Sequence, residues 1–366
     1  AFVHTQSSFW FSAWKRLRKN RGAVFGLFTI GVAIVVCIAA YYIAPDHSPN
    51  ANRMILEIGG QKPGFKMNFL LLPKEKAVQQ TGFFQRLING AEDAFNYIPV
   101  SSWQIKGDSI VVQKYIDEGI YERQAYNTSS PENVSGNYIV TKIFWCGTDK
   151  FGRDILSRLI VGTRVSLAVG LIAVSISLSI GILLGLMAGY FRGRTDNIIM
   201  WFINVIWSIP TLLLVFAITI VLGKGFWQVF IAVGLTLWVN VARIIRTQVM
   251  SIRELQYVEA AKALGFTDSR IIFRHILPNV LGPVMVIAAS NFAGAIVIEA
   301  GLSFLGVGVQ PPQPSWGLMI KENYNFIITH NPLLAIAPRV CIMILVLAFN
   351  LLGNGLRDAF DVREKV

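Results

Sequence analysis

Charged residues are scarce in this sequence. Only 15% of its 366 residues are Asp, Glu, Lys or Arg, while 54% are hydrophobic. A soluble protein of this size usually carries about a quarter charged residues. The deficit excludes an ordinary soluble protein and indicates a chain that resides largely in a membrane.

Cysteines and catalytic patterns are scarce as well. The three cysteines, Cys37, Cys146 and Cys341, do not have the spacing of a disulfide framework or a metal site. No His, Cys and carboxylate cluster indicates a metal, and no Ser, His and Asp set indicates hydrolysis. The phosphate-binding pattern G-x-x-x-x-G-K-[ST] is absent, because Gly223–Gln228 has its residues in the wrong order. We therefore expect a chain that is not an enzyme, binds no cofactor directly and does not hydrolyse ATP.

The net charge of +12 is the one feature that favours a nucleic-acid partner. The basic residues, however, lie beside the apolar runs instead of in a separate patch. That arrangement favours the anionic inner face of a membrane as their partner. We expect contact with the lipid bilayer and none with nucleic acid.

Six segments are apolar over roughly 20 residues, the length that a membrane-spanning helix needs. Only the last of them contains a charged residue, Arg339. The fold class that they predict is an all-α membrane protein with six transmembrane helices. The segments are Ala23–Ala44, Val165–Phe191, Ile198–Gly223, Gly225–Ala242, Ile276–Ile298 and Leu333–Leu356.

The basic residues of the short loops are concentrated on one side of these segments. The short loops of the opposite side hold only Lys224 and Lys321. Because cytoplasmic loops are the ones enriched in Lys and Arg, we expect both termini in the cytoplasm. The basic residues on that side are Lys15, Arg16, Arg18, Lys19, Arg21, Arg192, Arg194, Arg243, Arg246, Arg253, Lys262, Arg270, Arg274, Arg357, Arg363 and Lys365.

The chain then divides into five parts. A basic cytoplasmic segment, residues 1–22, precedes the first helix at 23–44. Residues 45–160 form an extracytoplasmic insertion between the first and second helices, and we expect it to be a small α+β unit. Within it, Trp103–Ile116 predicts a β-hairpin around Gly107 and Asp108. The membrane core follows at 161–356, and residues 357–366 form a cytoplasmic tail.

A charged segment, Tyr257–Asn279, is unusual in so apolar a chain. Its beginning belongs to Arg253–Leu264, which consists of good helix formers without Pro or Gly. Gly265 is suited to the left-handed conformation that ends a helix. The small side chains of Ala260, Ala261 and Ala263 would let a partner surface approach closely. The alternative is an amphipathic loop that lies on the membrane surface without a partner.

A second short helix is expected after this turn. Thr267 or Asp268 can cap it, and it runs to about Leu277, where Pro278 begins the return into the membrane. The charged side chains of the segment would register the partner by charge. Those side chains are Glu259, Lys262, Arg270 and Arg274.

The segment at 251–278 resembles the EAA loop of permease subunits in ABC importers. The resemblance rests on Glu259, Ala260, Ala261, Gly265, Leu277 and Pro278. "RIIFRHILPN" is similar to the form found in the oligopeptide and dipeptide permease branch. Three other stretches are also similar to that branch, namely Gly147–Gly170, Glu299–Gly317 and Leu347–Asp361. The resemblance covers about 147–361 and the basic start of the first span, but not most of 45–144.

The resemblance implies the type I ABC importer permease fold with six transmembrane helices, in a bacterial inner membrane. It also implies that the EAA loop seats in a groove on an ATPase subunit, with Glu259, Ala260, Ala261 and Gly265 as the contact core, followed by Leu277 and Pro278. Two ATPase subunits would bind ATP and Mg²⁺ and drive the permease between inward-facing and outward-facing states. The other implied partners are a second homologous permease and an extracytoplasmic solute-binding protein.

The function implied by the resemblance is ATP-driven import of peptides by alternating access. The same role for nickel, opines or oligosaccharides stays open, because these permeases share their motifs. A secondary transporter driven by an ion gradient would have inverted repeats and paired broken helices, and the sequence indicates neither. A signalling or scaffold protein that binds through its insertion is a further alternative, and the EAA pattern argues against it.

Two charged residues are expected at membrane depth, where a charge usually has a partner or a function: Glu299, directly after Ile276–Ile298, and Arg339, inside the last segment. Their expected depths match, so we predict that they form an ion pair or face one wet cavity. Alternatively, Arg339 binds a peptide carboxylate. Glu299 fits the family motif and Arg339 departs from it. Other polar residues of the spans would line the pathway or form interhelical hydrogen bonds, and they are Asn204, Ser208, Asn240, Ser290 and Asn291.

Overall fold

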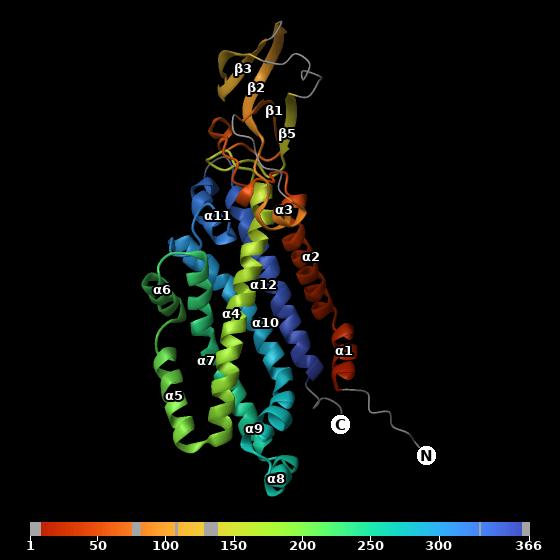
Figure 1. Ribbon diagram of the computed structural model, residues 1–366, viewed down its shortest axis with the longest axis vertical. Coiled ribbons are helices and arrows are strands. Elements are labelled where there is room, and N and C mark those ends of the chain that lie inside the picture. The colour runs from red at the N-terminus through yellow and green to blue at the C-terminus, as the bar shows by residue number, and fades with distance from the viewer. Residues whose placement is uncertain (1–8, 75–81, 107–108, 128–137, 329–330, 361–366) are drawn as a thin grey trace, which may run out of the picture. The chain divides into compact units, whose positions relative to one another are not determined.

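The computed structural model describes residues 9–74, 82–106, 109–127, 138–328 and 331–360 (Figure 1). The outermost parts of the predicted tails, 1–8 and 361–366, lie outside the described residues. The chain divides into two compact units. The first comprises residues 1–34, 166–310 and 342–366, and the second comprises residues 35–165 and 311–341.

Five helical segments of the described chain are long and apolar enough to cross a membrane. They match the first, second, fourth, fifth and sixth predicted spans, although most extend beyond the predicted ends. A short basic helix, α1 (Phe9–Lys19), precedes the first of them. The five segments are α2 (Arg21–Ile43), α4 (Ile155–Phe191), α7 (Phe226–Arg253), Asp268–Leu305 and α12 (Leu333–Phe360).

The third predicted span is not one straight helix. It consists of α5 (Gly193–Trp207) and α6 (Thr211–Leu222), which are bent by 91° at a short break, so that they form either a broken span or a re-entrant loop. Pro210 lies in the break. Proline lacks an N–H group and disfavours the helical conformation of the residue before it. The predicted span over 198–223 is therefore bent, and the described residues contain five spans, or six if the bent pair counts as one.

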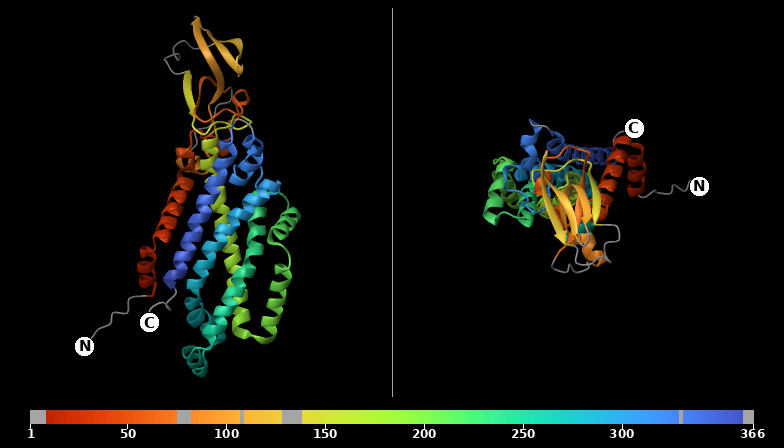
Figure 2. Two further views of the ribbon diagram at one scale, coloured as in Figure 1. Left: turned by 180° about the vertical axis from the view of Figure 1, so that it is seen from behind. Right: turned by 90° about the horizontal axis from the view of Figure 1, so that it is seen from above.

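Helix α7 lies at the centre of the first unit, where α5, α6 and α10 (Leu277–Leu305) pack against it (Figures 1 and 2). Three glycines spaced four residues apart let α4 approach α7 closely. A Cβ atom at Gly181 would lie 2.5 Å from Val241 Cβ, and one at Gly185 would lie 2.7 Å from the carbonyl oxygen of Ala242. At Gly189 the clash would be with Arg246. Small residues at this spacing are a common device for close helix packing in membranes.

The second unit contains a five-stranded antiparallel sheet with the order β4-β3-β2-β1-β5. The predicted hairpin is present as β2 and β3, which pair up to Lys106 and Ser109, while its turn residues Gly107 and Asp108 lie outside the described residues. The strands are β1 (Phe65–Pro73), β2 (Phe95–Lys106), β3 (Ser109–Asp117), β4 (Ile120–Asn127) and β5 (Ile139–Phe144).

The second unit also contains the start of α4, a small apolar core and several short helices. Asp154 caps α4, because its Oδ2 accepts a 2.9 Å hydrogen bond from the backbone N–H of Ser157. Phe69 is fully buried and packs with Tyr115 and Phe144 under the sheet. The short helices are η1 (Pro49–Ala51), η2 (Leu56–Ile58), α3 (Phe83–Asn89), α11 (Trp316–Asn323) and η5 (Tyr324–Ile327).

Candidate functional site

The predicted helix, turn and helix are present after the fourth span. α8 (Gln256–Ala263) follows α7, and Gly265 separates α8 from α9 (Asp268–Ile271) (Figure 1). The first helix is shorter than expected, because Arg253 is the last residue of α7. The six residues of the predicted loop motif therefore lie on α8, in its turn and at the start of α10.

A Schellman turn ends α8. Gly265 adopts φ +76°, in the left-handed region. Its N–H donates to the carbonyl of Lys262 at 2.9 Å, and the N–H of Phe266 donates to the carbonyl of Ala261 at 3.1 Å. These bonds satisfy carbonyl groups that a helix end otherwise leaves open. The direction of the chain after α8 is thus fixed by the backbone and requires a residue that tolerates positive φ.

One face of α8 is buried against the membrane helices. Val258 is fully buried and Ala261 is 4% exposed. They belong to one apolar cluster with Val249 of α7, Ile271 of α9 and Ile276. The inner face of α8 therefore packs on α7 and on the segment that leads into α10.

The second helix continues into the membrane without interruption. α9 passes through a single π-helical turn, Ile272–Ile276, into α10. Leu277 is half-buried, and Pro278 is exposed in the first turn of α10, where the missing N–H of proline costs little. The expected helix end at Leu277 is therefore wrong.

Polar contacts tie this region to α4 and α5. The hydroxyl of Tyr190 near the end of α4 donates to Asp268 Oδ1 of α9 at 2.5 Å. On α7, Arg246 forms a two-pronged ion pair with Asp196 of α5, with N–O distances of 2.5 and 2.6 Å. A bidentate pair fixes orientation as well as distance. Polar contacts therefore hold α9 to α4 and α7 to α5.

The outer face of α8 is exposed and mixed in character. Glu259, Ala260 and Lys262 are exposed, as predicted for a contact surface. Large apolar side chains are exposed beside them, with Leu264 at 74% and Phe273 at 59%. An apolar patch rimmed by charged residues is typical of a protein interaction site. The buried Ala261 instead supports the helix from inside.

The charged residues Glu299 and Arg339 lie in different environments. Glu299 of α10 is 1% exposed and accepts a 2.6 Å hydrogen bond from the Ser303 hydroxyl. Arg339 of α12 is exposed. The two residues belong to different compact units. Their pairing stays a prediction, as does a contact of Arg339 with substrate.

The polar residues predicted for the pathway are dispersed. Asn291 is buried in α10, and its Nδ2 donates to the Ser177 hydroxyl of α4 at 3.5 Å. Asn204 of α5 accepts a hydrogen bond from Arg243 of α7 at 3.1 Å. Both contacts are interhelical, which was the alternative role for these residues. Ser208, Asn240 and Ser290 are exposed in the single chain, and their role in a pathway stays a prediction.

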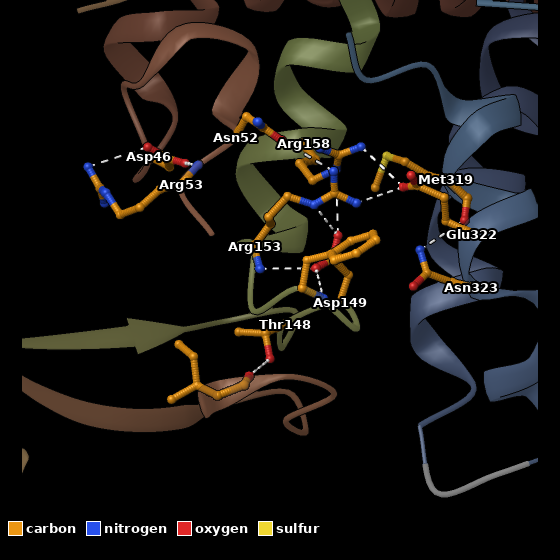
Figure 3. A network of polar contacts seen from close by, with 12 residues as sticks. Asp46, Asn52, Arg53, Thr148, Asp149, Arg153, Arg158, Met319, Glu322 and Asn323 are labelled. Carbon is orange, nitrogen blue, oxygen red and sulfur yellow. Dashed lines mark hydrogen bonds and ion pairs between the residues drawn. The ribbon is translucent and has the colours of Figure 1, made fainter. Parts of the chain in front are cut away.

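Sequence reasoning missed a buried ion network in the second unit (Figure 3). Arg153 and Arg158 are each 1% exposed. Arg153 Nε lies 2.6 Å from Asp149 Oδ2, and Glu322 Oε2 of α11 lies 2.8 Å from Arg153 Nη2 and 3.3 Å from Arg158 Nη2. The network joins the start of α4 to α11. The charged residues at 149, 153 and 158 are visible in the sequence before an apolar run, but no local signal identifies Glu322.

Lys142 is a half-buried charge of this unit. Its Nζ lies 4.3 Å from the centre of the Tyr97 ring, over which Arg53 also lies. Burial, and to a smaller extent the charge of Arg53, lowers the pKa of Lys142 to about 8. The folded state therefore disfavours the ammonium form.

Removing this charge is expected to stabilise the protein in a pH-dependent manner. Because the folded pKa of Lys142 lies below its ordinary value of 10.5, the native protein should lose stability as the pH falls from about 10.5 to about 8, and the loss is complete below about 8. Lys142→Met should therefore raise the apparent Tm at pH 7, and the gain should shrink toward pH 10. Thermal unfolding of the detergent-solubilised protein at pH 7, 8.5 and 10 measures this. Lys142→Arg, which stays charged, should show no gain, and an equal gain for Lys142→Met at every pH would contradict the explanation.

Two family models match the chain. One, described as a binding-protein-dependent transport system inner membrane component, matches residues 181–366. The other, described as the N-terminal transmembrane domain of oligopeptide transport permease C, matches residues 8–61. The first match includes α8, its turn and α9, and the second includes α1 and α2.

Relatives are found among transport proteins. A dipeptide transport system permease protein of Alkalihalophilus pseudofirmus is 38% identical over 275 residues, which are 75% of this chain and 90% of the relative. An oligopeptide transport system permease protein of Bacillus subtilis is 38% identical over 69% of this chain and 82% of its own length. A glutathione transport system permease protein of Pectobacterium atrosepticum is 42% identical over 60% of this chain and 73% of its own length.

Proposed function

The chain belongs to the family of binding-protein-dependent transport system inner membrane components, and from this premise we propose that it moves peptides across the inner membrane by alternating access. It is the permease subunit of a binding-protein-dependent importer and a multi-pass membrane protein. The peptide cargo is supported by the relatives, which are named as permeases for dipeptides, oligopeptides and glutathione.

The proposed contact with the ATPase is the outer face of α8. The observation that carries this proposal is the contrast between its two faces. Val258 and Ala261 are buried against the bundle, while Ala260 and Leu264 are exposed next to charged residues. An exposed apolar patch on a helix that is fixed from inside suits a groove on a partner. Movement of that partner would then be transmitted to α10 through α9 and to α4 through Tyr190.

Cross-linking tests this contact. A cysteine that replaces Ala263, on the exposed side of α8, should form cross-links to the ATPase subunit in membranes that contain the whole complex. A cysteine at Val258, which is buried, is the matched control and should form none. Cross-links from Ala263 only to lipid-facing or extracytoplasmic proteins would contradict the assignment.

The remaining partners are a pair of ATPase subunits that carry ATP and Mg²⁺, a second homologous permease and an extracytoplasmic solute-binding protein. The second permease is proposed because one such subunit cannot enclose a peptide-sized cavity. Both termini are proposed to lie in the cytoplasm with α8 and α9, since Arg253, Lys262, Arg270 and Arg274 cluster there. The sheet of the insertion would then lie outside.

Uptake measurements distinguish the cargo. Cells or vesicles that contain the complete importer should accumulate labelled di- to oligopeptides, and unlabelled peptides or glutathione should compete. Uptake of nickel, opines or oligosaccharides that unlabelled peptides do not inhibit would contradict the peptide cargo. It would favour the corresponding alternative cargo. The ligands that co-purify with the solute-binding protein provide an independent answer.

Substitutions at Gly265 are expected to reduce uptake in an order set by backbone strain. Among the described residues, no atom lies within 4 Å of a Cβ atom built at Gly265. The cost of a side chain there within this chain is therefore set by the positive φ of the residue. A Cβ atom in the left-handed conformation costs about 1–2 kcal/mol, and asparagine tolerates it better than alanine or valine. Uptake should therefore fall in the order Gly, Asn, Ala and Val, with ATPase activity retained. Equal uptake in Gly265→Asn and Gly265→Val would show that the turn does not set the position of α8.

A further inference from the structure

The short helix α3 exposes an unusual amount of apolar surface. Phe83 is 65% exposed, Phe84 75% and Ile88 62%. α3 lies in the insertion, between the residues matched by the two family models. Three large apolar side chains on a seven-residue helix would be unfavourable in water, so a partner is expected to cover them.

The apolar side chains of α3 share one side of the helix. With about 3.6 residues per turn, Phe83, Phe84, Leu87 and Ile88 fall within less than half of its circumference. Gln85, Arg86 and Asn89 occupy the other side. α3 is therefore amphipathic, with a polar side suited to water and an apolar side suited to a nonaqueous phase.

Contacts hold α3 at the end of α2. The hydroxyl of Tyr42, the next-to-last residue of α2, lies 3.4 Å from the carbonyl oxygen of Phe83, and the two rings are 5.6 Å apart. Arg86 lies over the same tyrosine ring at 5.1 Å. Arg164 of α4 donates to the carbonyl oxygens of Leu87 and Ile88, each at 2.8 Å. Both ends of α3 are thus fixed to membrane helices of the second unit.

These contacts place α3 beside the end of a membrane span. α2 is a membrane span, and Tyr42 stands one residue before its end, where tyrosine is enriched at the membrane–water boundary. Val35, Ile38 and Ile43 of α2 are 62%, 55% and 51% exposed, as expected for side chains that face lipid. The Tyr42–Phe83 contact makes the apolar side of α3 continuous with the end of this lipid-facing helix.

We propose that α3 is an interfacial membrane helix. It lies in the headgroup region of the leaflet at the end of α2, and Phe83, Phe84 and Ile88 insert among the upper acyl chains. Its polar side, with the exposed Gln85 and Asn89, faces water and phosphate groups. The insertion is thereby fixed to the lipid surface as well as to the membrane helices. A cover of α3 by the second permease or by the solute-binding protein is the competing explanation.

Spin labels test the proposal in the assembled importer in phospholipid nanodiscs. Single cysteines are introduced as Phe84→Cys, Ile88→Cys and, on the polar side, Gln85→Cys, in a chain whose Cys37, Cys146 and Cys341 are replaced and which still supports uptake. Collisions of each label with oxygen, which partitions into lipid, are compared with collisions with a water-soluble nickel chelate.

The expected result is an oxygen-to-nickel collision ratio several-fold higher at positions 84 and 88 than at position 85. Equal ratios with strong nickel access at all three positions would mean that α3 lies in water and would overturn the proposal. Low access of both reagents at positions 84 and 88 would mean that protein covers α3, and it would overturn the proposal equally. Neither result depends on which solute the importer carries.

Discussion

Replacing Arg153 with methionine is expected to lower the apparent Tm of the protein by on the order of 10 °C. Breaking a buried ion pair on one side costs about 3–5 kcal/mol, and each kcal/mol corresponds to a few degrees. Arg153 is 1% exposed, and its side chain reaches Asp149, Glu322 and Asn52. Methionine fills similar volume but leaves the Asp149 and Glu322 carboxylates, whose side chains are 1% and 12% exposed, with much less compensating charge.

A matched substitution separates this effect from a general loss of arginine. Arg123 of β4 is exposed, and its change to alanine should alter stability by no more than about 0.5 kcal/mol. Arg153→Lys keeps the charge but loses the forked geometry of the guanidinium group. Its loss of stability should therefore be smaller than that of Arg153→Met and larger than that of Arg123→Ala. Thermal unfolding of the detergent-solubilised chains measures all three. If the apparent Tm of Arg153→Met falls no further than that of Arg123→Ala, the network does not hold α11 to α4.

Ala260→Trp is expected to abolish uptake while the chain still folds and inserts. Ala260 is exposed on α8, so a large side chain there displaces nothing within the described chain. In a docked groove the indole would force the partner away, and losing a central contact of this kind costs at least about 2 kcal/mol of binding. The corresponding loss of affinity is roughly 30-fold. Uptake and the amount of ATPase that co-purifies with the permease are measured together.

Ala260→Ser is the control, because it changes little in size and should retain both uptake and co-purification. Retained uptake in Ala260→Trp would place the ATPase contact elsewhere on the chain. Loss of uptake with full co-purification would instead indicate that the tryptophan blocks transmission of movement and not docking. An unchanged apparent Tm in both variants is required for either interpretation.

The local structure of α8, its turn and α9 was predictable because its signals are local. Gly265 takes the left-handed conformation and Thr267 precedes α9, as the sequence indicated. Long apolar runs likewise identified α2 and, despite Arg339, α12. Helix ends were less predictable, since α7 continues through charged residues to Arg253. Such residues are tolerated where the helix leaves the hydrophobic part of the membrane.

The break between α5 and α6 and the ion network were not predicted, for different reasons. A proline such as Pro210 indicates a kink in a helix, but nothing local distinguishes a kink from a bend of 91°. The partners of Arg153 and Arg158 depend on tertiary packing, which brings Glu322 from the far end of the chain. The exposed side of α3 was missed because a seven-residue amphipathic stretch gives too weak a periodic signal.

The order of synthesis gives the buried ion network a further consequence. Arg153 and Arg158 precede Glu322 by 169 and 164 residues. At a translation rate of about 5–20 residues per second, Glu322 follows them after roughly ten to thirty seconds. During this interval the emerging chain has Asp149 but not its second acidic partner. A ribosome that stalls before α11 would therefore leave a nascent chain in which Asp149 is present for Arg153 and Arg158 but Glu322 is missing.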